Sequence, residues 1–305
     1  MFTIAVFGLG AWGRTLQGLW ERRGHRVLGW SRSGGGDPVA LLSQVDLVTS
    51  AVAMQGVEAL AAHLAPHWPE GLPLLSCSKG IDPERLVTPT QLWGHHLPGA
   101  PLLALSGPNL AGELARQLPA ASVIAATDPT LALQLQEQLS GDCLRLYRSS
   151  DPVGVEAGGA LKNVMAVAAG ICDGLGLGVN AKASLLCRGL AEMGVVVRGL
   201  GGEATSLYGL AGLGDLLATA NSPLSRNYRC GLLLAEGCDE ATAIERIGAT
   251  VEGPRTARAA LALARRQGWS LPICVQVLAV LEQTTTPAQA VQALMQRHLK
   301  AELAQ

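Results

Sequence analysis

The sequence predicts a two-domain protein in which residues 1–150 form a doubly wound α/β domain and residues 151–305 form an all-α domain. Short β-branched runs alternate with helical stretches in the first half of the chain. After Asp151-Pro152 the β-branched runs stop, and long stretches rich in alanine, leucine and glycine follow. Apolar residues make up 49% of the chain and charged residues only 15%. Because typical domains are about 25% charged, this composition favours closely packed layers.

The predicted strands of the first half are residues 4–7, 26–30, 46–52, 72–77, 102–106, 121–126 and 143–147. Between them, apolar residues at three-to-four spacing predict helices over residues 12–23, 56–64, 109–116 and 129–139. Strands that alternate with helices at this interval predict a parallel sheet with helices on both faces.

The second half is predicted to be helical throughout. Its expected helices are residues 153–172, 180–199, 213–220, 225–236, 241–247, 256–267, 273–282 and 287–299. Asp151-Pro152 is a plausible entry to the first of them. No internal repeat or low-complexity linker separates the halves, so we expect the two domains to pack around a shared cleft.

Charge and segment composition exclude several classes of protein. The net charge is −1 without blocks of like charge, so nucleic acid is not an expected partner. The apolar N-terminus lacks a basic leader, and glycines, prolines and charges interrupt every apolar stretch before the roughly 18 to 20 residues that cross a bilayer. The sequence therefore predicts a cytoplasmic protein that is not membrane-embedded. The seven cysteines form no C-x-x-C pair, which predicts reduced, mostly buried thiols and no metal site.

A glycine-rich hexamer follows the first predicted strand and opens the first predicted helix. It reads Gly8-Leu9-Gly10-Ala11-Trp12-Gly13 and matches G-x-G-x-x-G. Glycines at this spacing allow a tight turn, close approach of backbone to a pyrophosphate and close packing of helix on strand. In this context the motif predicts a Rossmann-type dinucleotide site that includes Gly8, Gly10, Ala11, Trp12 and Gly13.

The end of the second predicted strand bears on the choice of dinucleotide. An acidic residue there would bind the ribose diol of NADH, but the chain has Trp30-Ser31-Arg32-Ser33 and no carboxylate until Asp37. An arginine can pair with the 2′-phosphate of NADPH, so NADPH is favoured over NADH. The alternative is that Arg32 stacks on the adenine or faces solvent.

Lys162 is an unusual residue in an almost wholly apolar stretch. Ala160-Leu161-Lys162-Asn163-Val164 reads as the first turns of a long helix of small residues. An ammonium group there loses hydration unless it is paired, and burial lowers its pKa toward the range in which it exchanges protons. From this window alone, a surface lysine whose stem covers an apolar face is an equally good interpretation.

Two loops at the carboxyl ends of later strands carry further candidates, because open parallel sheets bind ligands at that edge. Lys79 follows the fourth strand and can reach an anionic substrate or the nicotinamide edge. Gly107 and Asn109 follow the fifth strand. Asn109 can cap the next helix, and a substrate contact is compatible with capping.

The helical half supplies a second set of polar residues. Asp215 and Thr219 are four residues apart and would share one face of a helix. Ser225 is typical of an N-cap, which would put Arg226 and Asn227 in a first turn that favours a phosphate. A cap explains Ser225 but not the two residues beside it.

In combination these motifs resemble the bacterial-type NAD(P)-dependent glycerol-3-phosphate dehydrogenases over nearly the whole chain. The matching motifs are the glycine loop at 8–13, Ser78-Lys79-Gly80-Ile81, Ser106-Gly107-Pro108, residues 154–156 with 160–164, residues 168–171 with 173–176, residues 188–193 and 209–215, Ser225-Arg226-Asn227, and Val251-Glu252-Gly253.

The resemblance implies reversible hydride transfer between NADPH or NADH and glycerone phosphate, giving sn-glycerol 3-phosphate for phospholipid synthesis. It implies that Lys162 is the proton donor and acceptor. The implied substrate-side residues are Lys79, Gly107, Asn109, Lys162, Asn163, Asp215 and Thr219, with Ser225, Arg226 and Asn227 at the phosphate. The implied cofactor-side residues outside the glycine loop are Arg32, Lys79, Ala111, Arg226 and Glu252. A homodimer is the candidate oligomer.

The chain departs from the family pattern in two places. The connection after the second strand is shortened to residues 33–38 and a short helix, which leaves the adenosine end more open. Asn109 stands where the family more often has threonine. Two rivals are a dehydrogenase of another hydroxy acid, disfavoured by the phosphate seat at residues 225–227, and a non-catalytic NADP-binding sensor, disfavoured by Lys162 with Asp215.

Overall fold

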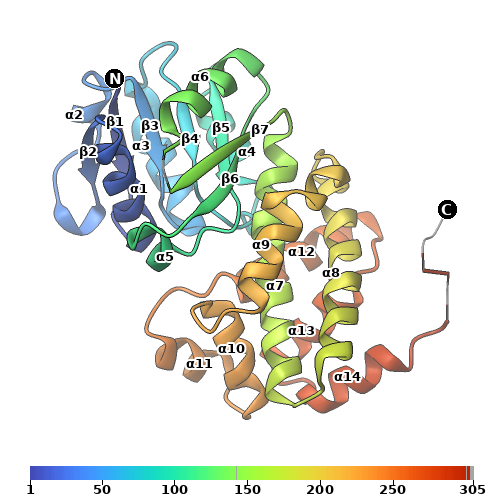
Figure 1. Cartoon of the computed structure of the whole chain (residues 1–305). Helices are drawn as coiled ribbons and strands as arrows, with labels where there is room; N and C mark the ends of the chain where they lie inside the picture. The colour runs from blue at the N-terminus through green and yellow to red at the C-terminus, as the bar shows by residue number, and fades with distance from the viewer. Residues whose placement is uncertain (142, 300, 303–305) are drawn as a thin grey trace.

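The computed structural model describes residues 1–141, 143–299 and 301–302, and it consists of a sheet domain packed on a helical domain (Figure 1). The sheet has seven strands in the order β2-β1-β3-β4-β5-β6-β7. The strands are β1 (Thr3–Phe7), β2 (Arg26–Trp30), β3 (Leu47–Ser50), β4 (Leu74–Ser76), β5 (Leu102–Ser106), β6 (Ala120–Ala126) and β7 (Leu144–Ser149). Each overlaps a predicted strand.

Helices cover both faces of this sheet, as the alternation of elements predicted. Apolar side chains of α1 and α6 pack with one face, and those of α3 and α4 with the other. The helices of this domain are α1 (Ala11–Arg22), α2 (Val39–Leu42), α3 (Val57–Leu64), α4 (Pro89–His96), α5 (Ala111–Ala115) and α6 (Pro129–Leu139). Short 3₁₀ turns lie at η1 (Arg32–Gly34), η2 (Met54–Gly56) and η3 (Ala65–His67).

The prediction of a parallel sheet is correct from β2 through β5 and wrong at the next junction. Strand β6 pairs antiparallel with β5, and β7 pairs parallel with β6. A parallel return needs a crossover long enough to traverse the sheet, usually a full helix. The link from β5 to β6 contains only the five-residue α5, whose first residue packs on α1, so the chain turns back at the same edge.

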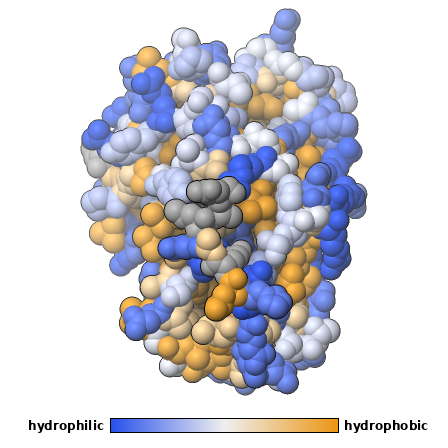
Figure 2. All heavy atoms as spheres, turned by 90° about the vertical axis from the view of Figure 1, so that its right-hand side faces the viewer, coloured by the Kyte–Doolittle hydropathy of each residue, from blue (hydrophilic) through white to orange (hydrophobic). Residues whose placement is uncertain are grey.

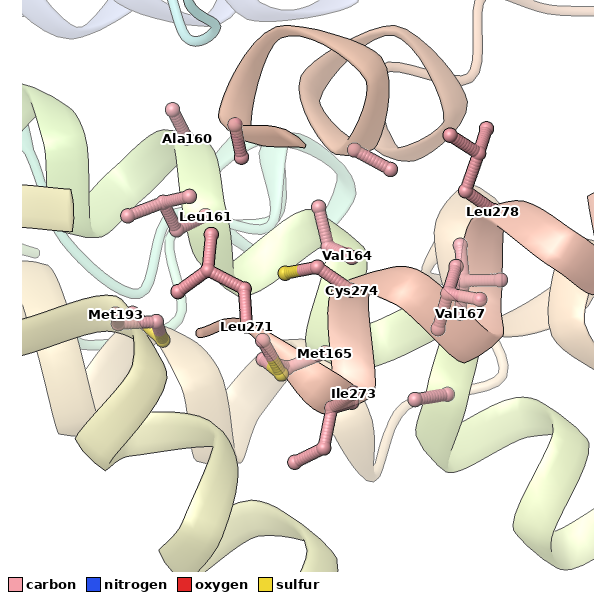
Figure 3. Packing of buried hydrophobic residues seen from close by; sticks show 14 of the residues in the cluster. Ala160, Leu161, Val164, Met165, Val167, Met193, Leu271, Ile273, Cys274 and Leu278 are labelled. Carbon is pink, nitrogen blue, oxygen red and sulfur yellow. The ribbon is translucent and has the colours of Figure 1, made fainter. Parts of the chain in front are cut away.

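The helical domain is built around α7 (Pro152–Gly174), whose residues from Gly154 to Cys172 are all buried. The other helices are α8 (Val179–Gly199), α9 (Asp215–Ala220), α10 (Arg226–Ala235), α11 (Glu240–Ile247), α12 (Gly253–Gln267), α13 (Pro272–Leu281) and α14 (Pro287–Met295), with a 3₁₀ turn η4 (Ala204–Tyr208) and a π-helical turn η5 (Leu210–Gly214). Figure 3 shows Leu161, Val164 and Met165 of α7 packed beside side chains from α8 and α13.

Helix α7 begins where the sequence predicted a helix entry. Asp151 is its N-cap and accepts a hydrogen bond from the Gly154 amide at 2.8 Å, and Pro152 occupies the first turn. Lys162 therefore lies almost three turns into the helix. The prediction from the local window, which placed it in the first turns, is wrong. Within the described part of the chain, α7 is long and apolar enough to cross a membrane, and its apolar stretch is entirely buried inside the protein.

Candidate active site

Lys162 and Asp215 meet where the helical domain faces the sheet domain. The Lys162 ammonium donates to Asp215 Oδ1 at 2.7 Å and to Thr219 Oγ1 at 2.5 Å. Thr219 Oγ1 also donates to Asp215 Oδ1, at 3.2 Å, because the two residues lie one turn apart on α9. All three side chains are buried. The prediction that Asp215 and Thr219 share a helix face beside the lysine is confirmed.

Burial changes the acid strength of Lys162. Loss of hydration lowers its pKa from 10.5 to about 8, while the negative charge of Asp215 opposes the shift and the positive charge of Lys79 adds to it. A lysine in this range gains and loses its proton near neutral pH, which a solvated lysine does not. The interpretation of Lys162 as a surface lysine is excluded because only 7% of the residue is exposed.

Lys79 reaches the same carboxylate from the sheet domain. Its ammonium donates to Asp215 Oδ2 at 2.5 Å and to the Gly107 carbonyl at 3.3 Å. Asp215 is thus held between two lysines from different domains. Gly107 has a φ of +149°, and a Cβ there would lie 2.9 Å from Ser122 Cα, so the close turn after β5 requires glycine.

The residues predicted to hold a phosphate lie one helix away. Ser225 caps α10 and accepts from the Tyr228 amide at 3.2 Å, as predicted. Asn227 Nδ2 donates to Asn163 Oδ1 at 2.8 Å, and Asn227 Oδ1 accepts from the Gly253 amide at 2.8 Å. Asn227 therefore joins α7, α10 and the start of α12, while Arg226 is exposed in the first turn of α10.

A close crossing of α7 and α10 sets this arrangement. A Cβ on Gly170 would strike the Tyr228 carbonyl, and a Cβ on Gly231 would strike the Val167 carbonyl and lie 2.8 Å from Gly170 Cα. The two helices approach backbone to backbone because both positions lack a side chain.

The glycine loop joins β1 to α1 in the geometry predicted for a dinucleotide site. Gly8 has a φ of +97° and lies against the backbone of Ala51, and a Cβ on Gly13 would strike the Gly8 carbonyl. A Cβ on Gly10 would meet no protein atom within 4 Å. Gly10 therefore lies beside open space at the N-terminus of α1, where Ala11 is also exposed. This space and the free amides of the helix N-terminus fit a bound pyrophosphate.

Arg32 lies at the same edge of the sheet as the glycine loop. It follows β2, whose last residue Trp30 pairs with Phe7 of β1, and its side chain is exposed. Asp37, the first carboxylate after β2, accepts from the Val39 amide at 3.0 Å and lies 3.0 Å from His63 Nε2. Asp37 therefore already has partners in its own loop and on α3.

The remaining cofactor-side candidates lie beside the glycine loop or at the contact between the sheet domain and the helical domain, here called the seam. The Ala111 carbonyl accepts from Thr15 Oγ1 of α1 at 3.3 Å, and Trp12 packs against the sheet core. Glu252 reaches across the seam, since a Cβ on Gly80 would lie 3.8 Å from its carboxylate. Burial raises the pKa of Glu252, and the charges of Arg255 and Arg226 oppose the rise.

The predicted capping role of Asn109 is wrong. Helix α5 begins at Ala111 with Leu110 as its N-cap and without a side-chain cap. Asn109 Oδ1 instead accepts from Ser122 Oγ at 2.5 Å, which ties the loop after β5 to β6. Ser122 lies on β6, a strand that the sequence predicted without its antiparallel direction.

Comparison with known proteins identifies the family of the chain. A curated glycerol-3-phosphate dehydrogenase [NAD(P)+] from Synechococcus sp. (strain RCC307) is 54% identical over 300 residues, which cover 98% of this chain and 99% of the relative. The chain belongs to the glycerol-3-phosphate dehydrogenase family. A relative of the same name from Trichormus variabilis is 45% identical over 301 residues, which cover 98% of this chain and 98% of the relative. Models of the NAD-dependent glycerol-3-phosphate dehydrogenase N-terminus and C-terminus match residues 35–132 and 151–292.

Solved structures of this family share the fold. The crystal structure of glycerol-3-phosphate dehydrogenase from Coxiella burnetii superposes with a TM-score of 0.92 at 33% identity and covers 97% of this chain and 99% of its own. The Dunaliella salina glycerol-3-phosphate dehydrogenase superposes with a TM-score of 0.87 at 20% identity, over 95% of this chain and 60% of its own, which supports the fold. The predicted resemblance and the two-part α/β and all-α architecture are confirmed.

Sequence reasoning assigned no role to three buried polar residues near the seam. Glu156 precedes Lys162 on α7 and accepts hydrogen bonds from Thr90 of α4. Ser76 and Ser106 end β4 and β5, and their hydroxyls are buried. Helix α4 was missed as well, although Thr88-Pro89 followed by Gln91 forms a capping box that the sequence shows.

The structure also reports on the cysteines and on metal ligands. All seven cysteines are free, and Cys77, Cys172, Cys230 and Cys274 are buried, whereas Cys187 is exposed. Within the described residues, histidine, cysteine, aspartate and glutamate side chains form no group of three or more that could hold a metal ion.

Proposed function

We propose that this chain interconverts glycerone phosphate and sn-glycerol 3-phosphate and that Lys162 is its proton donor and acceptor. The observation that carries the proposal is the buried Lys162, held by Asp215 and Thr219 beside the dinucleotide domain. Hydride transfer to a ketone leaves an alkoxide that must receive a proton as it forms. An ammonium group with a pKa of about 8 supplies that proton and polarises the carbonyl beforehand.

The second lysine has a different part in this proposal. Lys79 is 22% exposed at its side chain and approaches Asp215 from the sheet domain. Two ammonium groups around one carboxylate leave a net positive charge, which favours an anionic substrate beside them. Lys79 is anchored in this position through the Gly107 carbonyl, and Asn109 follows in the same loop after β5.

The phosphate of the substrate would bind at the start of α10. Arg226 is exposed there and can pair with two phosphate oxygens, while the helix N-terminus adds a favourable dipole. Asn163 and Asn227 are fixed by their mutual hydrogen bond and supply polar groups next to Lys162. Binding energy from the phosphate would thereby position the carbonyl at the lysine.

The nicotinamide cofactor would supply and receive the hydride, with its pyrophosphate on Gly8, Gly10 and Gly13. We propose that NADPH is preferred, because Arg32 is exposed at the edge where the 2′-phosphate would lie and Asp37 is already paired. Replacing Arg32 by alanine should raise the Kd for NADPH at least about tenfold and leave that for NADH within about twofold. An equal loss for both cofactors would contradict the preference.

One assay tests the proposed reaction. The protein is mixed with glycerone phosphate and either NADPH or NADH, and the absorbance of the reduced nicotinamide is followed. Phosphate-free dihydroxyacetone serves as the matched control, because it retains the ketone and lacks the group that Arg226 would bind. Consumption of reduced cofactor only with glycerone phosphate is expected, and no reaction with either cofactor would overturn the proposal.

We further propose a cytoplasmic enzyme whose product enters phospholipid synthesis, with a dinucleotide domain at residues 1–150 and a substrate domain at 151–305. The main apolar clusters support this boundary, since the sheet has two of its own and the helical bundle has a third that only Ile81 and Leu86 of the first half join. Expression of residues 1–150 alone tests it, since an autonomous domain should still bind NADPH. Cell fractionation tests the compartment.

We also propose that two copies of the chain pair through a groove of about 980 Å³ between α8, α13 and α14. Figure 2 faces the side of the molecule that carries α8 and α14 and shows hydrophobic side chains gathered in its lower part. Leu177 and Tyr208 line this groove and are 39% and 73% exposed, and large exposed apolar side chains are typical of interfaces. In a two-fold dimer the same face of both copies forms the interface. The exposed apolar side chains of one copy can therefore pack into the groove of the other.

Sedimentation of two matched variants tests the dimer. Ala191 lines the groove, whereas Ala183 is exposed on α8 outside it. Ala191→Arg should produce monomers and Ala183→Arg should not. A wild-type monomer, or dissociation by both substitutions, would contradict this interface.

A further inference from the structure

Glu156 is a buried carboxylate on α7 that the proposed chemistry leaves unused. Only 3% of the residue is exposed. The Thr90 amide donates to Oε1 at 3.1 Å and to Oε2 at 2.9 Å, and the Thr90 hydroxyl donates to Oε2 at 2.5 Å. Thr90 lies in the first turn of α4, a helix of the sheet domain. The three contacts therefore run from one domain to the other.

Burying the Glu156 carboxylate costs hydration free energy, so we ask what its position contributes. Burial raises the pKa of Glu156 to about 7, and hydrogen bonds from Thr90, Thr88 and Ser76 oppose that rise. In the described part of the chain, Glu156 forms no ion pair that would offset the lost hydration. The carboxylate is instead held by the N-terminus of α4, whose dipole favours negative charge.

Glu156 and Lys162 lie on the same helix, so a movement of one is passed to the other. The two residues are six apart on one continuous helix, a rise of about 9 Å along its axis. Gly159 lies between them, and a Cβ there would strike the Ser106 hydroxyl at the end of β5. Helix α7 thus lies directly on the carboxyl edge of the sheet, where the Glu156 contact adds directed hydrogen bonds to the apolar packing of Val155.

We propose that Glu156 is a positioning residue that holds α7 against the sheet domain and so sets Lys162 in register with the hydride donor. This inference rests on the proposed function, because it assumes that the nicotinamide is held by the sheet domain and that Lys162 protonates the substrate. Loss of the tie lets α7 shift relative to β5. Substrate and cofactor still bind, because Arg226 and the glycine loop each keep their place within one domain, but the hydride donor and the proton donor are no longer aligned.

Glu192 offers a matched control, since it is a buried glutamate that also accepts from backbone amides at a helix N-terminus but has no partner in the sheet domain among the described contacts. Its carboxylate accepts from the Ile273 amide at 2.6 Å and from the Cys274 amide at 3.2 Å, at the N-terminus of α13. Both partners lie in the helical domain. Glu192→Gln therefore removes a buried charge from a helix N-terminus without touching the seam between the domains.

The experiment compares Glu156→Gln with Glu192→Gln in the full chain, with rates corrected for the folded fraction. Glu156→Gln should lower kcat at least about tenfold, leave both KM values within about twofold, and raise the primary kinetic isotope effect measured with cofactor deuterated at the transferred position. Glu192→Gln should change the melting temperature and leave kcat and the isotope effect unaltered. An unchanged isotope effect in Glu156→Gln, or an equal loss of kcat in both variants, would overturn the proposal.

A second pair of variants keeps the test decisive if Glu156→Gln does not fold. Thr90→Ser retains both donors to Glu156, whereas Thr90→Val retains only the amide. Thr90→Val should reproduce the lowered kcat and raised isotope effect, and Thr90→Ser should restore wild-type values; identical kinetics for the two would refute the assignment. Turnover of glycerone phosphate by the wild type tests the proposed function separately. Failure of the proposed function is therefore not confused with failure of the positioning role of Glu156.

Discussion

Replacing Asp215 by asparagine should shift the pH dependence of catalysis by an amount that the geometry allows us to estimate. Asp215 Oδ1 lies 2.7 Å from Lys162 Nζ, and the side chains are 2% and 9% exposed, so solvent screens the pair weakly. Opposite charges about 4 Å apart attract by about 4 kcal/mol at an effective dielectric constant of about 20. Asparagine keeps an oxygen for the hydrogen bond, so we take about 3 kcal/mol as lost. At about 1.4 kcal/mol per pH unit, the pKa of Lys162 should fall by about two pH units.

The sign of this change follows from the direction of the reaction. Reduction of the ketone requires protonated Lys162, so its rate should fall as the pH rises through about 8 in the wild type. Oxidation of the alcohol requires the neutral lysine and should rise over the same interval. In Asp215→Asn both transitions move to lower pH, and at pH 7.5 the protonated fraction drops from about three quarters to about 3%, a loss of about 25-fold in reduction.

The measurement is kcat/KM for glycerone phosphate between pH 5.5 and 9.5, with the Kd for NADPH measured by fluorescence at each pH. Asp173→Asn is the control, because Asp173 accepts from Lys182 at 2.5 Å and lies near the far end of α7. It removes a lysine-paired carboxylate while leaving Lys162 untouched, so its transition should stay near pH 8. If Asp215→Asn keeps the wild-type transition, Lys162 is not the titrating acid and the assigned mechanism fails.

Three further substitutions test other parts of the site. Lys162→Ala should lower turnover at least about a hundredfold with an unchanged Kd for NADPH, and near-normal turnover would be incompatible with a proton-donating lysine. Arg226→Met should raise KM for glycerone phosphate at least about tenfold in initial-rate measurements, and an unaltered KM would remove Arg226 from the phosphate seat. Gly231→Ala should lower the free energy of unfolding by about 1–3 kcal/mol in denaturant titrations because its Cβ would strike the Val167 carbonyl. Gly112→Ala, whose Cβ would meet no atom within 4 Å, is its control, and equal stability of both variants would contradict the close crossing.

The sequence predicted those features that depend on local patterns. The alternation of strands and helices, the glycine loop, the Asp151-Pro152 helix entry and the Ser225 cap each arise from neighbouring residues, and the structure contains all of them. Asp215 and Thr219 were placed on one face because helical periodicity fixes which residues at four-residue spacing are adjacent. Their approach to Lys162, which is 53 residues from Asp215 and 57 from Thr219, came from resemblance to a family and not from spacing.

What the sequence did not predict depends on partners far along the chain. Strand direction at β6 is decided by how the short α5 docks on α1, and no residue pattern in residues 120–126 records it. Asn109 was assigned to capping because its nearest neighbours allowed it, yet its partner is Ser122 across the antiparallel pair. The tie between Glu156 and Thr90 spans 66 residues, and a buried glutamate in an apolar run gives no local sign of its partner.

The buried polar residues of α7 contact different neighbouring helices, so one helix can separate the proposed proton transfer from the proposed phosphate binding. Successive residues on a helix point about 100° apart, so Lys162 and Asn163 face different neighbours although they are adjacent in sequence. Lys162 meets α9 through Asp215, and Asn163 meets α10 through Asn227, next to Arg226. Under the proposed function, the proton donor and the phosphate site would therefore lie on either side of one substrate position. Since Glu156 faces α4 in the sheet domain, each polar residue of this otherwise apolar stretch is paired with a different element, and only the Glu156 contact links α7 to the sheet domain among the three.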